Sequence, residues 1–351
     1  MSPNAKPRPG LSEEEPYTSP QFDVPVRLNT NECPTPLPES FHAMLATVVH
    51  EIPLHRYPDS EMPRLREKLA AHVSRPAEMI WAANGSNEIL TELFLAYGGP
   101  ARKVAIFEPT YVLHGRLAWL THTATVDFTM DPPFILGPKD VAEAAATKPD
   151  IVLVCSPNNP TGNAQGLDVI RRFAVQTDAL VVVDEAYIDF GGETALPLID
   201  ELPNLVVVRT FSKAFALAGA RLGYCVAAPA VIDDLRRVRL PYHVSALTQA
   251  AGIAALLHAD EAEAIVERIR AERDRLLEGL MAIPDVVTFP SDANFVLFKP
   301  SKPAGLVWQG LLDRGVLVRD MTAVVPGALR VSAGTTSEVD RFFEALGEVL
   351  A

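Results

Sequence analysis

The sequence has only three cysteines among its 351 residues, namely Cys33, Cys155 and Cys225. Their spacing does not match a metal-binding arrangement of cysteines. Cys155 and Cys225 lie in apolar, strand-like runs, which indicates that they are small core residues. We therefore expect no metal site, and the chain suits a reducing cytoplasm.

Long apolar runs and positive charge are also scarce. No apolar stretch approaches the roughly 20 residues of a membrane-spanning helix. The polar, proline-rich residues 1–16 lack the apolar core of a signal peptide, and we expect them to form a mobile tail. Lys and Arg number 31 against 44 for Asp and Glu, so the formal net charge is −13. We therefore expect a cytoplasmic protein that binds neither membranes nor nucleic acid, although a local basic pocket for an anion stays compatible with this charge.

Apolar residues are plentiful, at 48% of the chain, which is enough for a sizeable core. In the first two thirds of the chain, apolar strand-like runs alternate with helical patterns. This alternation predicts a largely parallel α/β sheet. After about Ser245 a long charged helical region precedes short strands and helices, and this change predicts a second, smaller α+β domain.

Polar residues follow two strand-like runs in the middle of the chain. The run VVV leads to Asp184 and Tyr187, and the run LVVV leads to Ser212 and Lys213, with Arg221 shortly after. Because parallel strands deliver such groups at their carboxyl ends, these side chains are expected to converge on one crevice. An acid, a phenol, an amine and an arginine in one crevice suit pyridoxal phosphate (PLP).

The chemistry of PLP assigns each of these residues a role. The amine of Lys213 can hold the PLP aldehyde as a Schiff base. The carboxylate of Asp184 can keep the pyridine nitrogen protonated, so that the ring accepts electrons. Tyr187 can hydrogen-bond the ring oxygen. Ser212 and Arg221 can hold the phosphate.

Further candidates lie upstream of this stretch. Gly85, Ser86 and Asn87 stand where an apolar run turns into an amphipathic helix. Backbone N–H groups at such a helix start can bind the PLP phosphate, and a capped helix without a ligand is the alternative. Tyr111 can stack on the PLP ring, and Asn159 can donate to its oxygen. A single histidine near Tyr111 is expected to be structural.

Several motifs resemble those of a known family. DEAYIDF, TFSKAFALAGARLGY and SPNNPTG look like fold-type-I PLP enzymes of the class II aminotransferases. LNTNE, HRYPD, WAANGSNEIL, RLPYH and SDANFVLF narrow the resemblance to histidinol-phosphate aminotransferases. The resemblance runs from about Tyr17 to the end of the chain. It implies an α/β fold whose large domain has a mostly parallel seven-stranded sheet flanked by helices, beside a smaller α+β domain.

The resemblance also implies a domain organisation. Residues 17–40 would form an N-terminal arm that packs with the small domain. Residues 41–244 would form the large PLP-binding domain, and residues 245–351 the small C-terminal domain. The family further implies a homodimer in which Tyr57 reaches the cofactor phosphate of the partner subunit.

Four residues are implied as substrate ligands. Asn31 would lie at the mouth of the site, and Arg319 and Arg330 would hold the anionic group of the substrate. Tyr17 would close over the substrate phosphate, with an aromatic anchor in the arm as the alternative. Cys33 stands where the family usually has an asparagine, and no role is assigned to it.

The resemblance implies transfer of an amino group between L-histidinol phosphate or imidazole-acetol phosphate and 2-oxoglutarate or glutamate, in histidine biosynthesis. An aromatic amino-acid aminotransferase is the closest alternative, because phenylalanine and histidinol phosphate share a flat ring and an anion. A PLP-dependent lyase, such as a threonine-phosphate decarboxylase, is a second alternative. The PLP-sensing half of a transcription regulator is a third, but it would need a DNA-binding domain before the fold.

Overall fold

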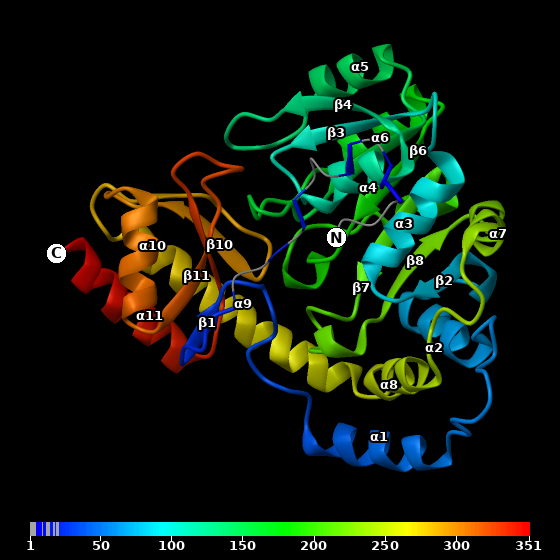
Figure 1. Ribbon diagram of the computed structural model, residues 1–351, viewed down its shortest axis with the longest axis horizontal. Helices are drawn as coiled ribbons and strands as arrows, with labels where there is room; N and C mark the ends of the chain where they lie inside the picture. Colours follow the sequence, from blue (N-terminus) through cyan, green and yellow to red (C-terminus); the bar gives the residue numbers. More distant parts are fainter. Residues whose placement is uncertain (1–4, 9, 12–14, 17, 19–20) are drawn as a thin grey trace.

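Two β-sheets form the framework of the protein. A computed structural model describes residues 5–8, 10–11, 15–16, 18 and 21–351. The larger sheet lies on one side of Figure 1 and the smaller sheet on the other. The long helix α9 (Ala259–Met281) extends from the larger part to the smaller sheet, where it packs against strands β9 and β10. Its 23 residues span about 35 Å at the usual helical rise.

The larger sheet has seven strands in the order β2-β8-β7-β6-β5-β3-β4. Their bounds are β2 (Ile80–Ala83), β3 (Lys103–Glu108), β4 (Ala124–Thr129), β5 (Ile151–Cys155), β6 (Leu180–Asp184), β7 (Leu205–Thr210) and β8 (Gly223–Ala227). The strands from β7 to β4 pair in parallel, whereas β8 is antiparallel to both β7 and β2. The expected α/β fold with a mostly parallel seven-stranded sheet is therefore confirmed.

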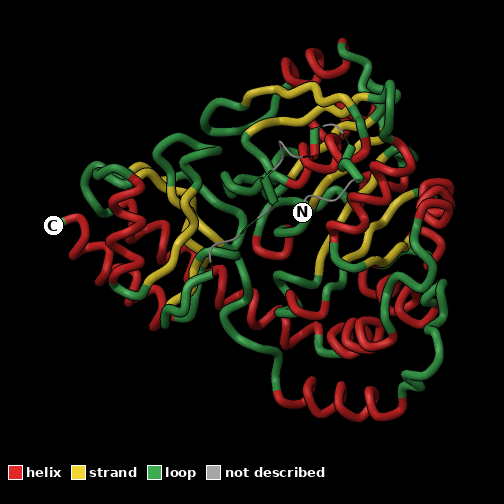
Figure 2. Tube along the Cα trace, viewed as in Figure 1, coloured by secondary structure: helices red, strands yellow, loops and turns green. Residues whose placement is uncertain are grey.

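Helices surround the larger sheet (Figure 2). They are α1 (Glu39–Glu51), α2 (Pro63–Val73), α3 (Ser86–Tyr97), α4 (Leu113–Thr121), α5 (Pro138–Ala146), α6 (Leu167–Gln176), α7 (Pro229–Val238) and α8 (Ala246–Leu256). α3 packs against α4, α7 and β8, α5 packs against α6, and α8 packs against α1 and α2. Within the described part of the chain, no helix combines the length and the apolar character that crossing a bilayer demands.

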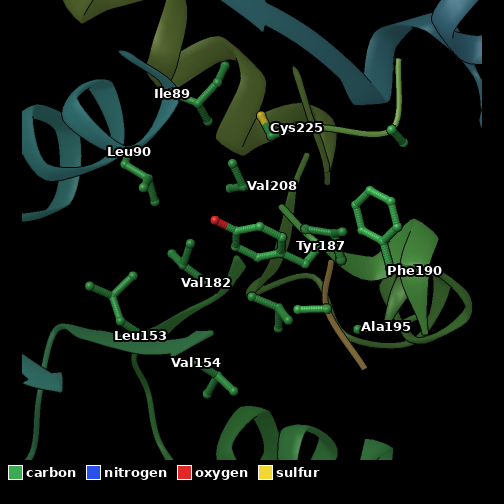
Figure 3. Close-up of a cluster of buried hydrophobic side chains, with 14 of the residues drawn as sticks. Ile89, Leu90, Leu153, Val154, Val182, Tyr187, Phe190, Ala195, Val208 and Cys225 are labelled. Carbon is green, nitrogen blue, oxygen red and sulfur yellow. The ribbon is translucent and has the colours of Figure 1, made fainter. Parts of the chain in front are cut away.

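The core explains why the central strands read as unbroken apolar runs. Every residue of β5, β6 and β8 is buried, as is typical of strands covered on both faces. Figure 3 shows Leu90 of α3 in one cluster with Leu153 of β5, Val182 of β6 and Val208 of β7. The ring of Tyr187 lies within the same cluster. The side chain of Tyr187 is therefore held in place by a packed apolar layer.

The smaller sheet has five strands in the order β1-β11-β12-β10-β9. Their bounds are β1 (Val26–Leu28), β9 (Val287–Thr288), β10 (Phe295–Lys299), β11 (Val316–Asp320) and β12 (Leu329–Ser332), accompanied by α10 (Ala304–Asp313) and α11 (Thr336–Leu350). β1 pairs in parallel with β11, although some 290 residues separate them in the sequence. This pairing places the segment that follows β1 beside the carboxyl ends of the strands in the larger sheet.

The strand order of the larger sheet reverses beside β3. The chain goes from β3 outward to β4, and the following strands β5, β6 and β7 lie on the other side of β3. In open α/β sheets such a reversal leaves a crevice outside the carboxyl ends of the strands, and ligands bind there. The loops that begin at Glu108 and Cys155 leave the sheet at this point.

Candidate active site

A cavity of about 880 Å³ opens where the carboxyl ends of the larger sheet face the edge of the smaller sheet. Its walls contain most of the side chains that the sequence singled out. These are Asn31, Ser86, Asn87, Tyr111, Asn159, Asp184, Tyr187, Ser212, Lys213, Arg221, Arg319 and Arg330. A space of this size accommodates a cofactor together with a small substrate.

Two of the predicted residues, Gly85 and Tyr57, do not line the cavity. Gly85 is next to the cavity, because a Cβ built on it would lie 2.6 Å from Nη2 of Arg221. Tyr57 is 81% exposed, and its ring stacks on Tyr242 with 4.4 Å between the centroids rather than lining this cavity. Tyr17 lies outside the described residues.

Lys213 follows the end of β7 and lies in the wall of the cavity. Its Nζ donates a hydrogen bond to the carbonyl oxygen of Thr30, at 3.1 Å. Burial, helped by the positive charges of Arg330 and Arg221, lowers the pKa of Lys213 to about 8. A much larger fraction of this amine is therefore neutral at physiological pH than of an ordinary lysine, and a neutral amine can act as a nucleophile or a base.

Asp184 ends β6 and is only 2% exposed. Its Oδ1 accepts a hydrogen bond from the backbone N–H of Ala186 at 3.1 Å, and its Oδ2 lies 3.4 Å from Nε2 of His114. His114 is itself 1% exposed. A carboxylate held in this way has a fixed orientation at the floor of the cavity.

His114 makes a contact with the site that the sequence did not reveal. The sequence indicated a structural histidine, and the structure places it against both Asp184 and the edge of the Tyr111 ring, with 5.7 Å between the ring centroids. The available signal was its spacing. His114 follows Tyr111 by three residues, and its backbone N–H donates to the carbonyl oxygen of Tyr111 at 2.9 Å, so one turn after β3 brings both residues together.

Asn31 connects the two sheets at the cavity. Its Nδ2 donates to the hydroxyl oxygen of Tyr187 at 3.0 Å, and its Oδ1 accepts from Oγ of Ser332 in β12 at 2.9 Å. Its φ of 54° lies in the left-handed region, which asparagine tolerates better than most residues. Burial raises the pKa of Tyr187, so the phenol stays protonated at neutral pH and can donate a hydrogen bond.

Positive groups gather at the N-terminus of α3. The helix begins at Ser86, and Gly85 before it has a φ of 83°. The guanidinium of Arg221 lies against Gly85, and its Nη1 donates to Oγ of Ser212 at 3.3 Å. A Cβ on Gly223 would lie 2.2 Å from the backbone nitrogen of Ser86, so glycine there allows β8 to approach the helix. Together the helix start, a hydroxyl and an arginine form a site suited to a phosphate.

Two arginines form a second positive group on the opposite wall. Arg319 of β11 and Arg330 of β12 are directly paired across the antiparallel strands, so their side chains share a face. The 7% exposed Arg330 donates to Oδ1 of Asn159 and, at 2.9 Å, to the carbonyl oxygen of Asn29. Like charges directly opposite each other are destabilising. An anion bound between the two arginines would offset this cost.

The sequence of the chain matches the model of a known family. The family described as aminotransferase class I and II matches residues 24–346. A histidinol-phosphate aminotransferase of Streptomyces avermitilis is 47% identical over 356 residues, which are 97% of this chain and 96% of the relative. One of Frankia casuarinae is 46% identical over 361 residues, which are 98% of this chain and 90% of the relative.

The fold is also shared with solved structures. The crystal structure of histidinol-phosphate aminotransferase from Sinorhizobium meliloti in complex with pyridoxal-5'-phosphate has a TM-score of 0.87 and 23% identity. The match covers 99% of this chain and 98% of that chain. At this identity the likeness concerns the fold alone.

Proposed function

The chain belongs to the class I and II aminotransferase family, and from this we propose that it transfers an amino group between L-histidinol phosphate and 2-oxoglutarate. The products are imidazole-acetol phosphate and glutamate, and the physiological setting is histidine biosynthesis. The cofactor is PLP. Two relatives that are named for this activity are 46–47% identical to this chain over nearly its whole length. The observation on the structure that supports it best is the paired Arg319 and Arg330 in the cavity wall.

The residues of the cavity fit PLP. A bound PLP supplies an aldehyde that takes up amines and a protonated pyridine ring that withdraws electrons from the substrate Cα. Lys213 is the amine for the aldehyde, and the buried Asp184 is the carboxylate for the pyridine nitrogen. Tyr111 provides a ring for stacking. Because Oδ1 of Asn159 already accepts from an arginine, its amide nitrogen is the donor for the ring oxygen, together with the hydroxyl of Tyr187.

We assign the cofactor phosphate to the positive group at α3. Ser86 and Asn87 supply the helix N-terminus, and Ser212 and Arg221 supply side-chain donors. Gly85 lets the guanidinium of Arg221 lie close to the backbone. The charge of Arg221 and the helix dipole act in the same direction, so both favour a dianion here.

Lys213 is the proton carrier in this proposal. With PLP bound and its own amine released by the substrate, Lys213 would be the base that takes the proton from the substrate Cα and later gives it back. A base works best when its pKa lies near the working pH, and the pKa of Lys213 is about 8. Asp184 and Tyr187 hold their positions throughout, because each is buried and hydrogen-bonded.

In this proposal Arg319 and Arg330 bind the anionic group of the substrate. A phosphate dianion needs more than one cationic partner to offset its desolvation, whereas a single carboxylate can be held by one bidentate arginine. Arg330 is buried and fixed by two hydrogen bonds, so it suits both substrates. Arg319 is more exposed and its Nη2 lies 3.5 Å from the carbonyl oxygen of Thr18. The second arginine therefore serves the phosphate, with Asn31 and Tyr17 as further proposed contacts.

Arginine substitutions test this assignment. Arg330→Ala should damage the half-reactions of both histidinol phosphate and glutamate. Arg319→Ala should lower kcat/KM for histidinol phosphate roughly tenfold more than for glutamate, since a charge-assisted hydrogen bond contributes about 1.5–3 kcal/mol. Arg172→Ala, which removes an exposed arginine on α6 outside the cavity, is the control. Equal losses for both substrates in Arg319→Ala would contradict a phosphate-specific role.

A substrate panel tests the activity as a whole. The half-reactions with histidinol phosphate, glutamate, phenylalanine and threonine phosphate can be followed by the absorbance change of the cofactor. Histidinol phosphate and glutamate should react fastest. A preference for phenylalanine would identify an aromatic amino-acid aminotransferase instead, and decarboxylation of threonine phosphate would identify a lyase.

We also propose a cytoplasmic homodimer whose sites use residues of both subunits. Tyr57 and its stacking partner Tyr242 are both exposed, which fits a surface that meets a second copy of the chain. In this assembly Tyr57 contacts the cofactor phosphate of the partner subunit. The division of each subunit into an arm (17–40), a large domain (41–244) and a small domain (245–351) belongs to the same proposal.

Mixed dimers test the shared site. Lys213→Ala and Tyr57→Phe chains, each impaired alone, should regain activity when mixed, because in a hybrid one site contains both defects and the other contains neither. If Tyr57 served its own subunit, each site of the hybrid would keep one defect and mixing would restore nothing. Sedimentation measurements showing a fully active monomer would also contradict the dimer.

A further inference from the structure

A second cluster of ionisable side chains lies outside the cavity, on the flank of α3. Glu88 and Glu92 are four residues apart on this helix and therefore share a face. His243 comes from the segment between α7 and α8. One potential ligand atom from each of the three residues lies within 4.8 Å of the other two. None of them takes part in the chemistry proposed above.

One carboxylate oxygen of Glu92 is buried without a hydrogen-bond partner among the described residues. The residue is only 3% exposed, and its Oε2 accepts a hydrogen bond from Nε1 of Trp81 at 2.8 Å. Its Oε1 is buried and has no hydrogen-bond partner among the described residues. Burial raises the pKa of Glu92 to about 8. An unpaired buried carboxylate is costly and is relieved by a proton or by a cation.

His243 is oriented as a metal ligand would be. Its Nε2 lies 3.0 Å from the carbonyl oxygen of Ala82 and must donate to it, which leaves the lone pair on Nδ1. Within the described part of the chain, Nδ1 is buried without a partner. The ring is held by stacking on Trp81, with 5.4 Å between the centroids. A histidine that binds a metal through one nitrogen typically donates its other N–H to a carbonyl or carboxylate.

Asn84 links Glu88, the third candidate ligand, to His243. Oε2 of Glu88 accepts from the backbone nitrogen and from Nδ2 of Asn84, at 2.6 and 2.9 Å. The same Nδ2 also donates to the carbonyl oxygen of His243 at 2.6 Å. Oε1 of Glu88 is therefore the oxygen that remains for a ligand. Arg239 stacks on Trp81, and its guanidinium donates to Glu61 at 2.7 Å. Among the described residues, it forms no ion pair with Glu88 or Glu92.

We propose that Glu88, Glu92 and His243 bind a divalent transition-metal ion such as zinc. One imidazole nitrogen and two carboxylate oxygens suit zinc better than calcium or magnesium, which prefer oxygen ligands alone. The ion neutralises the two carboxylates and fills the coordination of Nδ1. It joins the first two turns of α3 to the segment before α8, and so stabilises the helix whose N-terminus forms the phosphate site.

Metal titration of the full-length, PLP-loaded protein tests this proposal. After removal of metals with a chelator, calorimetry with zinc should show about one saturable site per chain, as for a structural ion. Glu92→Gln keeps an acceptor for Trp81 but removes the charged ligand, so it should weaken zinc binding roughly tenfold or more. His50→Gln alters an exposed histidine on α1 and should leave zinc binding unchanged.

Two further measurements separate this site from adventitious zinc. Zinc should raise the Tm of the native protein and have a smaller effect on Glu92→Gln. Cobalt should quench the emission of Trp81, because its indole contacts Glu92 and His243, and Trp81→Phe should remove most of that quenching. The absence of saturable zinc binding, or equal affinity in the native protein, Glu92→Gln and His243→Gln, would overturn the proposal and leave a proton as the partner of Oε1 of Glu92.

Discussion

Replacing Lys213 with alanine is expected to abolish both the visible absorbance of the covalently held cofactor and nearly all turnover. The side chain supplies the attachment to the PLP aldehyde and also the base for the substrate Cα. General-base catalysis alone contributes up to about 10⁴-fold, so the combined loss in kcat should reach at least this size. The measurement is single-turnover kinetics with histidinol phosphate, together with the absorbance spectrum between acidic and alkaline pH.

A matched control distinguishes a chemical effect from a structural one. Lys68→Ala removes an exposed lysine on α2 and should leave both the spectrum and kcat unchanged. The Lys213→Ala chain should also keep a native Tm when PLP is present, because Arg221 and Ser86 at the phosphate site remain. A Lys213→Ala protein that kept its pH-sensitive spectrum and its turnover would show that another amine holds the cofactor.

The convergence of the site could be predicted because it depends on a local rule. Asp184 and Lys213 each follow a strand-like apolar run, and parallel strands present such residues at one edge. Hydrophobic patterning therefore indicated the strands, and their polar ends indicated the crevice. The direction of β8 could not be predicted in the same way, because it is set by pairing with β7 and β2, which are distant in the sequence or separated by irregular segments.

The details of the site depend on contacts that no short pattern contains. His114 reaches Asp184 across 70 residues, and Asn31 reaches Tyr187 across 156. The family resemblance implied Arg319 and Arg330 as ligands of the substrate anion, but only the register of β11 with β12 places them opposite each other. A register shift of one residue would turn one of them to the other face of the sheet.

The cluster of Glu88, Glu92 and His243 illustrates the same limit more sharply. The spacing of the cysteines predicted no metal site. Two residues of the cluster share a helix face, but the third is about 150 residues away and is brought in by the segment before α8. What marks them as candidates is the buried, unpaired Oε1 of Glu92 and Nδ1 of His243, which only the folded structure reveals.

Asp184→Asn is expected to leave PLP binding largely intact and to slow removal of the Cα proton by roughly 10³-fold or more, as for other groups that stabilise charge in the transition state. The amide has the shape of the carboxylate and still meets His114, but it has no negative charge to keep the pyridine nitrogen protonated. The ring then withdraws electrons poorly from the substrate. Single-turnover rates with histidinol phosphate and with glutamate should fall together, because both substrates use the same ring.

The position of His114 sharpens this last test. Its Nε2 lies 3.4 Å from Oδ2 of Asp184, and His114 is not among the residues that line the cavity, so we expect it to orient the carboxylate rather than to contact the cofactor. His114→Gln should therefore lower the rate of proton removal less than Asp184→Asn does. The control is Asp178→Asn, which alters an exposed carboxylate just before β6 and should have no effect on this rate. Near-normal half-reaction rates in Asp184→Asn would refute the role of this carboxylate. Equal losses in Asp184→Asn and His114→Gln would instead mean that the orientation of the carboxylate matters as much as its charge.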